Sequence, residues 1–244
     1  RDLPRLLRPG DLLVANRSAL RPAAVDAERI APDGGAPRRF LVHLAQRYGP
    51  GTWLVEPRVD EATPGPLDLP SGTRVRVAGV EARLLDAYPG LPRLRFLRVD
   101  RRATGGPDLA EAAERRGRPV RYGHLRARPP RSAYATVFGD RPGSAEMASA
   151  GRPFTPALLE ALRARGVGLT RITLHAGVSG LEAPEDDAAL RVPAEAFEVS
   201  ADAARAVNEA LADRRRVVAI GTGAVRALET AWDGRSVRPT RGWT

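Results

Sequence analysis

The stretch from Arg216 to Trp232, RVVAIGTGAVRALETAW, constrains the fold of this chain more than any other. It opens with the apolar and mostly β-branched run Val217 to Ile220, which predicts a buried strand. Gly221, Thr222 and Gly223 interrupt this run, and the residues that follow favour a helix with Thr222 as its N-cap. Such a helix start presents free backbone N–H groups, which suit an anion or a polar ligand group. Many strand–glycine–helix units bind nothing, so the pattern alone leaves both interpretations open.

The residues before this stretch predict further elements of an α/β sheet. Residues 167–175 are expected to form a strand, with amphipathic helices before and after it. His175 would then lie at the carboxyl end of its strand, where open α/β sheets place their ligands. We therefore expect a discontinuous α/β domain, formed by residues 1–20 and 101–244, with a mixed or parallel sheet and flanking helices.

Residues 21–100 have a different pattern. Short alternating runs recur between residues 40 and 99, and clusters of Pro, Gly and Asp separate them. Alternation of this kind is typical of half-buried strands, and several such strands in succession indicate a small antiparallel sheet or barrel. We expect this segment to form a small antiparallel β-barrel domain that is inserted into the α/β domain.

The composition of the chain indicates a polyanionic partner. Of its 244 residues, 39 are cationic, all of them arginine, and 29 are acidic, which gives a net charge of +10. This excess favours RNA or DNA over an anionic membrane. The absence of cysteine excludes disulfides and thiolate metal sites, and we expect no metal. No apolar run approaches the roughly 20 residues of a membrane span, and the first residues do not resemble a signal peptide, so we expect a cytoplasmic protein.

A basic segment from Arg115 to Phe138 carries seven arginines and no acidic residue. Aromatic side chains are interleaved with the arginines, and this combination offers base stacking together with phosphate contact. A solvated surface loop is the alternative interpretation. If the segment binds nucleic acid, the residues expected to contact it are Arg118, Arg121, Tyr122, Arg126, Arg128 and Arg131.

Three blocks stand in one order along the chain: PGSAEMASAGRPFT at residues 142–155, TLHAGVSGLEA at 173–183, and AIGTGAVRALET at 219–230. Together they resemble the S-adenosylmethionine:tRNA ribosyltransferase-isomerases of queuosine biosynthesis. The stretches LRPGDLLVANRSALRPA, SAYATVF and PAEAFEV are similar to further segments of that family. The resemblance spans nearly the whole chain. Its closing residues, 241–244, match a point at which family members continue, which leaves open whether this chain is a fragment, a processed form or part of something longer.

The resemblance implies a reaction in which S-adenosylmethionine donates its ribosyl group instead of its methyl group. The acceptor would be 7-aminomethyl-7-deazaguanine at the wobble position of a tRNA, and the products would be epoxyqueuosine, adenine and methionine. The sulfonium acidifies the adjacent ribose methylene, so a base of modest strength could form an ylide. The departing adenine needs a proton or a hydrogen-bond donor, and the methionine carboxylate needs an anion seat.

Carried over position by position, the resemblance also implies a set of site residues. His175 is expected to carry a proton, and Glu195 to act as a base or to bind the donor ribose. A core histidine and a surface glutamate are the alternatives for these two residues. We expect a monomer that binds the anticodon arm of tRNA, with Gly221, His175 and Gly151 converging on one cavity. The residues expected to contact S-adenosylmethionine are Asn16, Gly151, Gly221, Thr222, Arg226 and Glu229.

The chain departs from the family pattern at several of these positions. The family's PTAGLHF is ASAGRPF here, which removes a histidine, and its NDTR is NRSA, which removes an aspartate. The family's HSE has become Pro193-Ala194-Glu195. These changes leave two alternatives open. One is a relative that uses S-adenosylmethionine with a small-molecule acceptor, and the other is a non-catalytic RNA-binding protein.

Overall fold

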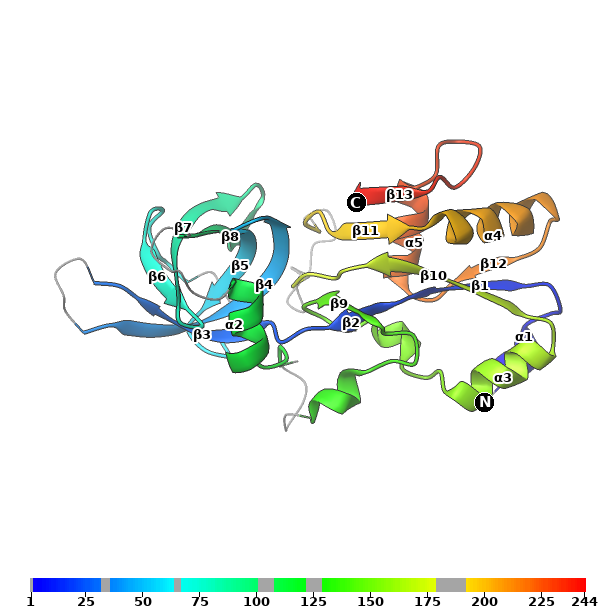
Figure 1. Ribbon diagram of the computed structural model, residues 1–244, viewed down its shortest axis with the longest axis horizontal. Coiled ribbons are helices and arrows are strands. Elements are labelled where there is room, and N and C mark those ends of the chain that lie inside the picture. The colour runs from blue at the N-terminus through cyan, green and yellow to red at the C-terminus, as the bar shows by residue number, and fades with distance from the viewer. Residues whose placement is uncertain (1, 32–35, 64–66, 101–107, 122–128, 179–191) are drawn as a thin grey trace.

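The computed structural model describes residues 2–31, 36–63, 67–100, 108–121, 129–178 and 192–244. Two parts lie side by side along the longest axis of the molecule (Figure 1). One part is a β-barrel, and the other is a sheet with helices on both faces that contains both chain termini. The predicted fold class, a mixed α/β sheet with a small antiparallel barrel, is confirmed. The exact domain boundaries, at residues 21 and 100, remain predictions.

The five-stranded sheet is mixed. Its order is β12-β1-β10-β11-β13. β1 is parallel to both β12 and β10, whereas β11 is antiparallel to its neighbours β10 and β13. The three parallel strands therefore end at the same edge of the sheet. Their bounds are Leu12–Asn16 for β1, Gly168–Leu174 for β10, Ala196–Val199 for β11, Val217–Ala219 for β12 and Thr240–Trp243 for β13.

Alternation along β1 divides the helices between the two faces of the sheet. Leu12 and Val14 pack with helices α4 and α5, whereas Leu13 packs on the opposite face near α3. Both cores are apolar, so burial on the two faces holds this layered arrangement together. The helices are α1 (Leu3–Leu6), α3 (Pro156–Ala164), α4 (Ala201–Ala212) and α5 (Thr222–Thr230). No helix in the described part of the chain is long and apolar enough to cross a membrane.

Six antiparallel strands close the barrel in the order β3-β4-β5-β8-β7-β6. Trp53, Leu84 and Leu97 are among the buried residues of its core. Helix α2 (Leu109–Arg116) contributes Leu109 to the same core, so it packs against the barrel. The strands are β3 (Ala24–Arg29), β4 (Arg38–Gly49), β5 (Thr52–Arg58), β6 (Arg74–Val77), β7 (Val80–Tyr88) and β8 (Leu91–Val99).

A short parallel ladder lies between the barrel and the sheet. It pairs β2 (Ser18–Leu20) with β9 (Arg141–Ser144). Two single-turn 3-10 helices flank β9 along the chain, η1 (Arg131–Tyr134) before it and η2 (Ser149–Gly151) after it. The connection from β1 through β2 into β3 carries the chain from the sheet to the barrel (Figure 1).

Two local predictions for the strand–glycine–helix stretch were wrong. β12 is an edge strand, and its residues are half-buried instead of buried. Gly221, with φ of +84°, is the N-cap of α5, and no side chain caps that helix. Thr222 is the first helical residue and not the N-cap. Threonine favours the N-cap position, but the left-handed backbone that precedes this helix requires a glycine there.

Candidate active site

A cavity of about 450 Å³ opens where the three parallel strands end. Residues from all three sequence blocks line it: the loop before η2 together with the first residues of η2, the end of β10 and the start of α5. The predicted convergence of Gly221, His175 and Gly151 is met by Gly221 alone, because neither His175 nor Gly151 lines this cavity. The lining residues are Asn16, Glu146, Met147, Ala148, Ser149, Ala150, Leu174, Ala176, Val192, Glu195, Ile220, Gly221, Thr222, Gly223, Ala224 and Arg226.

Asn16 fixes the end of β1 against the end of β10. Its Oδ1 accepts hydrogen bonds from the backbone N–H groups of Leu174 and Ser18, both at 3.0 Å. Its Nδ2 donates to the Leu174 carbonyl at 2.9 Å. The side chain is only 7% exposed, so these bonds replace water at buried backbone groups. Asn16 therefore forms part of the cavity wall. One N–H of its amide is bonded to Leu174, and the second N–H remains for a ligand.

Gly221 brings the loop and the helix start together. A Cβ atom at this position would lie 2.8 Å from the Cβ of Ala150, and the φ of +84° also disfavours a side chain. The first N–H groups of α5 have no acceptor within the helix, and no side chain caps them. Together with the helix dipole, they make this wall of the cavity suited to a carboxylate.

Glu195 is the buried acidic residue of the cavity, with 3% exposure. Its Oε2 lies 2.7 Å from Nη1 of Arg226, and its Oε1 accepts from the Gly177 N–H at 2.7 Å. Burial raises the pKa of the Glu195 carboxyl above its ordinary value, although the Gly177 N–H and the Arg226 charge act in the opposite direction. Arg226 is thus engaged with Glu195 and does not stand in the cavity as an unpaired cation.

Thr244 completes this cluster, and the sequence analysis missed it. Its Oγ1 accepts from Nη2 of Arg226 at 2.6 Å and from the Glu195 N–H at 3.3 Å. The Thr244 N–H donates to the Glu195 carbonyl at 3.0 Å. These contacts arise because β13 pairs with β11. The two strands are distant in sequence, so local patterns do not predict their pairing.

His175 does not line this cavity. It follows Leu174 on β10, and neighbouring residues of a strand point to opposite faces. Its Nδ1 lies 2.7 Å from Oγ of Ser18. Its ring packs against Gly143, where a Cβ would come within 2.4 Å of it. Burial lowers the pKa of His175, and the charge of Arg21 lowers it further, so the imidazole is neutral at pH 7.

A chain of hydrogen bonds couples the tautomer of His175 to two serine hydroxyls. The Ala176 N–H donates to Oγ of Ser144 at 3.0 Å, and Oγ of Ser144 lies 2.6 Å from Oγ of Ser18. When the Ser144 hydroxyl donates to Ser18, Ser18 donates to Nδ1 of His175 and the neutral ring carries its proton on Nε2. The reverse direction of both bonds places the proton on Nδ1.

The barrel holds both flanks of the site. Gln46 of β4 donates from Nε2 to the His175 carbonyl. Tyr48, also on β4, donates to the Ala194 carbonyl at 3.0 Å and stacks on Trp243 of β13 with ring centroids 4.4 Å apart. The barrel thus contacts the backbone of His175 and of Ala194, the residue before Glu195, so it contributes to the geometry of the α/β part.

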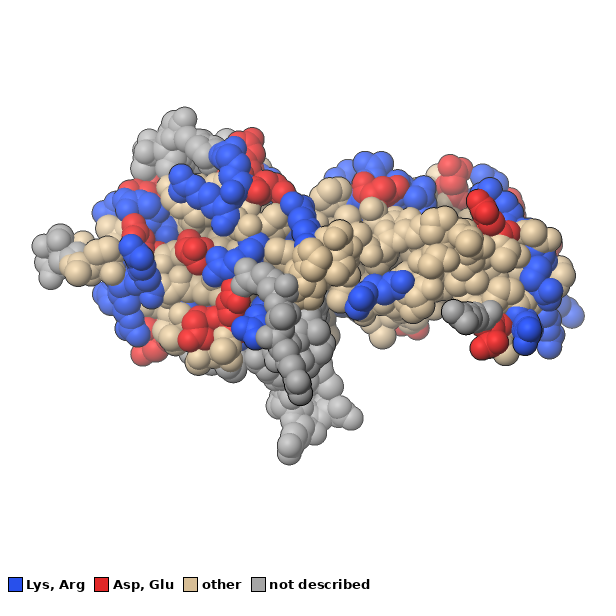
Figure 2. Space-filling model, turned by 90° about the horizontal axis from the view of Figure 1, so that it is seen from below, with Lys and Arg blue, Asp and Glu red and all other residues tan. Residues whose placement is uncertain are grey.

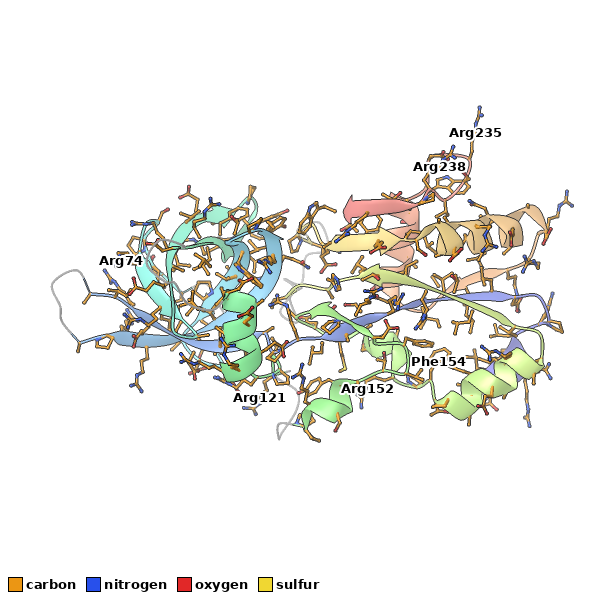
Figure 3. The ribbon with its side chains drawn as sticks, in the orientation of Figure 1. Arg74, Arg121, Arg152, Phe154, Arg235 and Arg238 are labelled. Carbon is orange, nitrogen blue, oxygen red and sulfur yellow. The ribbon has the colours of Figure 1, made fainter. Side chains whose placement is uncertain are left out.

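The other predicted site residues occupy different places. Gly151 is buried behind the cavity wall, where its missing Cβ lets it approach Phe138 and Thr136. Glu229 is exposed on α5 and does not line the cavity. Arg118 pairs with Asp26 at 2.9 Å and Glu61 at 2.6 Å, and Arg131 pairs with Glu114 at 3.4 Å. Arg121 and Arg152 both lie on the lower side of the molecule (Figure 3). Tyr122, Arg126 and Arg128 lie outside the described residues.

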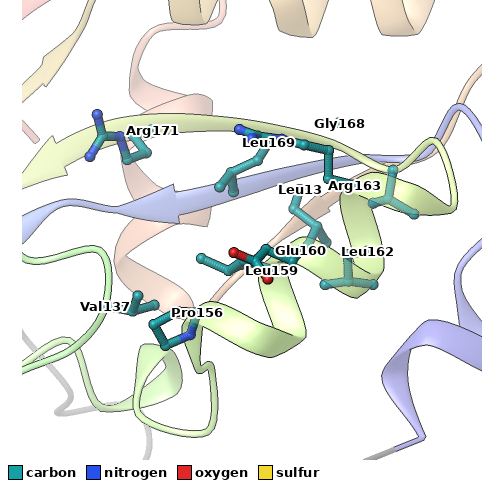
Figure 4. Close-up of a pocket in the computed structure, with 11 residues that line it drawn as sticks. Leu13, Val137, Pro156, Leu159, Glu160, Leu162, Arg163, Gly168, Leu169 and Arg171 are labelled. Carbon is teal, nitrogen blue, oxygen red and sulfur yellow. The ribbon is translucent and has the colours of Figure 1, made fainter.

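A larger cavity, of about 660 Å³, lies on the other face of the sheet between α3 and strands β1 and β10 (Figure 4). Its wall is largely apolar, from residues such as Leu13, Leu159 and Leu169, with Arg171 at one end. None of the predicted S-adenosylmethionine or catalytic residues lines it. In the described part of the chain, no group of three or more His, Asp or Glu side chains is placed to hold a metal ion.

The fold and the cavity define an α/β protein with an associated barrel and a ligand site at the carboxyl edge of its parallel strands. A family model described as "Queuosine biosynthesis protein" matches residues 1–244, and the chain belongs to that family. The resemblance inferred from the motifs is thereby confirmed.

Relatives with assigned names support the same family. The S-adenosylmethionine:tRNA ribosyltransferase-isomerase of Thermus thermophilus is 37% identical over 243 residues, which cover 95% of this chain and 65% of that protein. The protein of the same name from Deinococcus radiodurans is 36% identical over 270 residues, which cover 100% of this chain and 67% of that protein. This chain therefore spans about two thirds of the length of these relatives. A crystal structure of the S-adenosylmethionine tRNA ribosyltransferase of Thermotoga maritima matches 94% of this chain and 58% of that one, with 23% identity and a TM-score of 0.33.

Proposed function

We propose that this protein transfers and isomerises the ribosyl group of S-adenosylmethionine onto 7-aminomethyl-7-deazaguanine in tRNA, with release of adenine and methionine. The observation that carries the proposal is the cavity of about 450 Å³ shared by the family's sequence blocks. Its volume is within the range of small-molecule sites. The names of the relatives agree with this reaction.

The cavity offers a suitable partner for each part of a sulfonium nucleoside. The helix start at Gly221 and Thr222 would receive the methionine carboxylate. The amide of Asn16 and the carboxylate of Glu195 would meet the polar ribose and amino groups. Arg226 would act by orienting Glu195, to which it is hydrogen-bonded at 2.7 Å, and not by binding the cofactor directly.

Glu195 is the proposed base for the ribose methylene next to the sulfonium. A carboxylate with a raised pKa is a stronger base than an ordinary glutamate, while the Arg226 guanidinium acts in the opposite direction and favours its ionised form. His175, as the Nε2–H tautomer bonded to Ser18, would serve as a proton donor or carrier from the other face of β10.

tRNA is the proposed macromolecular partner, and the basic segment 115–138 is the proposed contact for its anticodon arm. Arg118, Arg121 and Arg131 are the described arginines of this set. Arginine side chains also spread over the barrel on the lower face of the molecule (Figure 2), and the net charge is +10. RNA binding through these groups would weaken steeply with salt. A cytoplasmic monomer is the form proposed to act on tRNA.

Release of adenine tests the proposal. The protein is incubated with S-adenosylmethionine and either tRNA carrying 7-aminomethyl-7-deazaguanine, the same tRNA carrying guanine, or the free deazaguanine base, and adenine is measured by mass spectrometry. Adenine that forms only with the modified tRNA supports the proposal. Adenine with the free base would instead indicate a small-molecule acceptor, and RNA binding without adenine would indicate a non-catalytic protein. Glu195→Gln should abolish release while the variant still binds S-adenosylmethionine.

A further inference from the structure

The segment 176–178, which follows His175, lies between the barrel and the candidate active site. Its Gly177 N–H donates to Oε1 of Glu195 at 2.7 Å, and the Arg226 guanidinium bonds to the other carboxylate oxygen at 2.7 Å. The segment therefore supplies one of the donors that hold the proposed base in place. The direction of the Gly177 N–H is part of the geometry of that base.

Two barrel side chains bond the carbonyls on either side of Gly177. Gln46 of β4 donates from Nε2 to the His175 carbonyl, and Arg93 of β8 donates from Nη2 to the Val178 carbonyl at 3.1 Å. A Cβ on Gly177 would lie 3.3 Å from Nε2 of Gln46, so the segment packs directly on β4. Because peptide units are planar, holding the units on both sides limits rotation of the one that carries the Gly177 N–H.

Arg93 is itself held by a buried carboxylate of the barrel. Oε1 of Glu56, a fully buried residue, lies 3.3 Å from Nη1 of Arg93 and 3.3 Å from Nη1 of Arg58. Burial raises the pKa of Glu56, but its contacts with His43 and the two arginines outweigh burial and lower the pKa, so the carboxylate is ionised at neutral pH. The rigid fork of Arg93 thus binds a barrel anion with one nitrogen and the Val178 carbonyl with the other.

Apolar packing fixes the same segment from the same side. The Val178 side chain is buried in a cluster with Leu41 of β4, Leu54 of β5 and Leu94 of β8. Apolar contact is not directional, so it places the side chain without setting the direction of the backbone groups. The hydrogen bonds from Gln46 and Arg93 supply that direction.

We infer that Gln46 and Arg93 are positioning residues of the active site, which orient the Gly177 N–H towards the Glu195 carboxylate. This inference rests on the proposed function, because it takes Glu195 as the base. Neither barrel residue lines the cavity assigned to S-adenosylmethionine, so both act through Gly177 and not by contact with that substrate.

Carbon-13 NMR of the Glu195 side-chain carboxyl tests the inference by titration of the unmodified protein, Arg93→Met and Gln46→Met. Both substitutions keep an unbranched side chain and remove the donor to the segment. The Gly177 N–H favours the ionised carboxylate, so its displacement should raise the pKa of Glu195 further above that of an ordinary glutamate. The resonance is identified by its absence in Glu195→Gln.

Arg98→Met is the matched control. Arg98 lies on β8 like Arg93, but it is exposed and donates to the Thr52 hydroxyl, so the pKa of Glu195 should not change. Arg226 and Tyr48, which also interact electrostatically with Glu195, are present in every variant.

Adenine release separates positioning from substrate binding. With S-adenosylmethionine and tRNA carrying 7-aminomethyl-7-deazaguanine, kcat of Arg93→Met at pH 7 should fall by about tenfold or more, because the base is misaligned. Part of this loss should be recovered as the pH rises and Glu195 ionises. The affinity for S-adenosylmethionine should not change, since the wall of its cavity is intact.

A pKa of Glu195 that is unchanged or lowered in the folded variants would overturn the inference and reduce these contacts to attachments between barrel and sheet. If Gln46→Met does not fold, since Gln46 is buried, Arg93→Met decides alone, because the Arg93 side chain is partly exposed. If the unmodified protein releases no adenine with any tRNA, the proposed function fails. The NMR titration still decides whether the barrel positions the Gly177 N–H.

Discussion

The substitution Arg226→Met tests how much the ion pair between Arg226 and Glu195 stabilises the folded protein. The change keeps the length and apolar volume of the side chain but removes the guanidinium that lies 2.7 Å from Oε2 of Glu195. Glu195 is 4% exposed and Arg226 30% exposed at the side chain. Breaking a fully buried pair costs about 3–5 kcal/mol, and an exposed pair about 0–1 kcal/mol. With one partner buried and the other partly open, we expect a loss of about 2 kcal/mol at pH 7, or about thirtyfold in the unfolding equilibrium.

The loss should depend on pH with a definite sign. The pKa of Glu195 is raised in the folded protein, so the folded state holds this proton more tightly than the unfolded state. Stability from this group therefore falls as pH rises from the unfolded pKa through the folded pKa. Without Arg226 the folded pKa rises further, because one of the interactions that lower it is gone. The penalty of Arg226→Met should consequently be large at pH 7–8 and small below about pH 4, where Glu195 is protonated in both states.

Urea denaturation at several pH values measures this penalty. In a Glu195→Gln background no carboxylate remains, so Arg226→Met should cost little and its cost should not vary with pH. Arg205→Met is the matched control, because Arg205 is exposed on α4 and pairs with exposed Asp202 and Glu209, so no resolvable change is expected. A penalty equal at pH 4 and pH 8 would refute the electrostatic reasoning.

Three further perturbations test other parts of the site. Gly221→Ala should lower the free energy of unfolding, measured in urea, by about 1–2 kcal/mol, because φ is +84° there and the added methyl group would meet the loop. S-adenosylmethionine affinity should fall as well, and unchanged stability would contradict this backbone assignment. Asn16→Asp removes the donor to a β10 carbonyl and buries a charge, so the folded state should lose about 3 kcal/mol, more at pH 8 than at pH 4; a pH-independent loss would argue against a buried carboxylate. Nitrogen-15 NMR of His175 should show the proton on Nε2 in the unmodified protein and a mixture of tautomers in Ser144→Ala; a protonated Nδ1 in the unmodified protein would reverse the proposed hydrogen-bond chain.

Local patterns predicted the elements of the fold better than their arrangement. Alternating runs between residues 40 and 99 predicted barrel strands, and the stretch after Arg216 predicted a strand, a turn and a helix. The sheet order was not predictable in this way, because each strand pairs with segments distant in sequence. For the same reason β12, whose apolar residues suggest burial, is an edge strand.

For the site, too, the sequence predicted which residues belong together but not how they contact one another. Asn16, Gly221, Thr222, Glu195 and Arg226 were expected together from their motifs, and all five line one cavity. Their bonds to one another were not predictable, since these depend on strand register and on rotamers.

His175 was expected at the site but lies on the other face of the sheet. Alternation along β10 already places it on the face opposite to Leu174, but the sequence does not say on which face the cavity lies. Ser18, Ser144 and Thr244 were missed because common hydroxyl residues give no signal until the fold brings them to a partner.

A crystal structure of the protein with S-adenosylmethionine tests the central claim most directly. The account predicts electron density for the ligand in the cavity between the start of α5 and Glu195, with the methionine carboxylate at the N–H groups of Thr222 and Gly223. Density in the apolar cavity beside α3, or against Glu229 on the outside of α5, would contradict it.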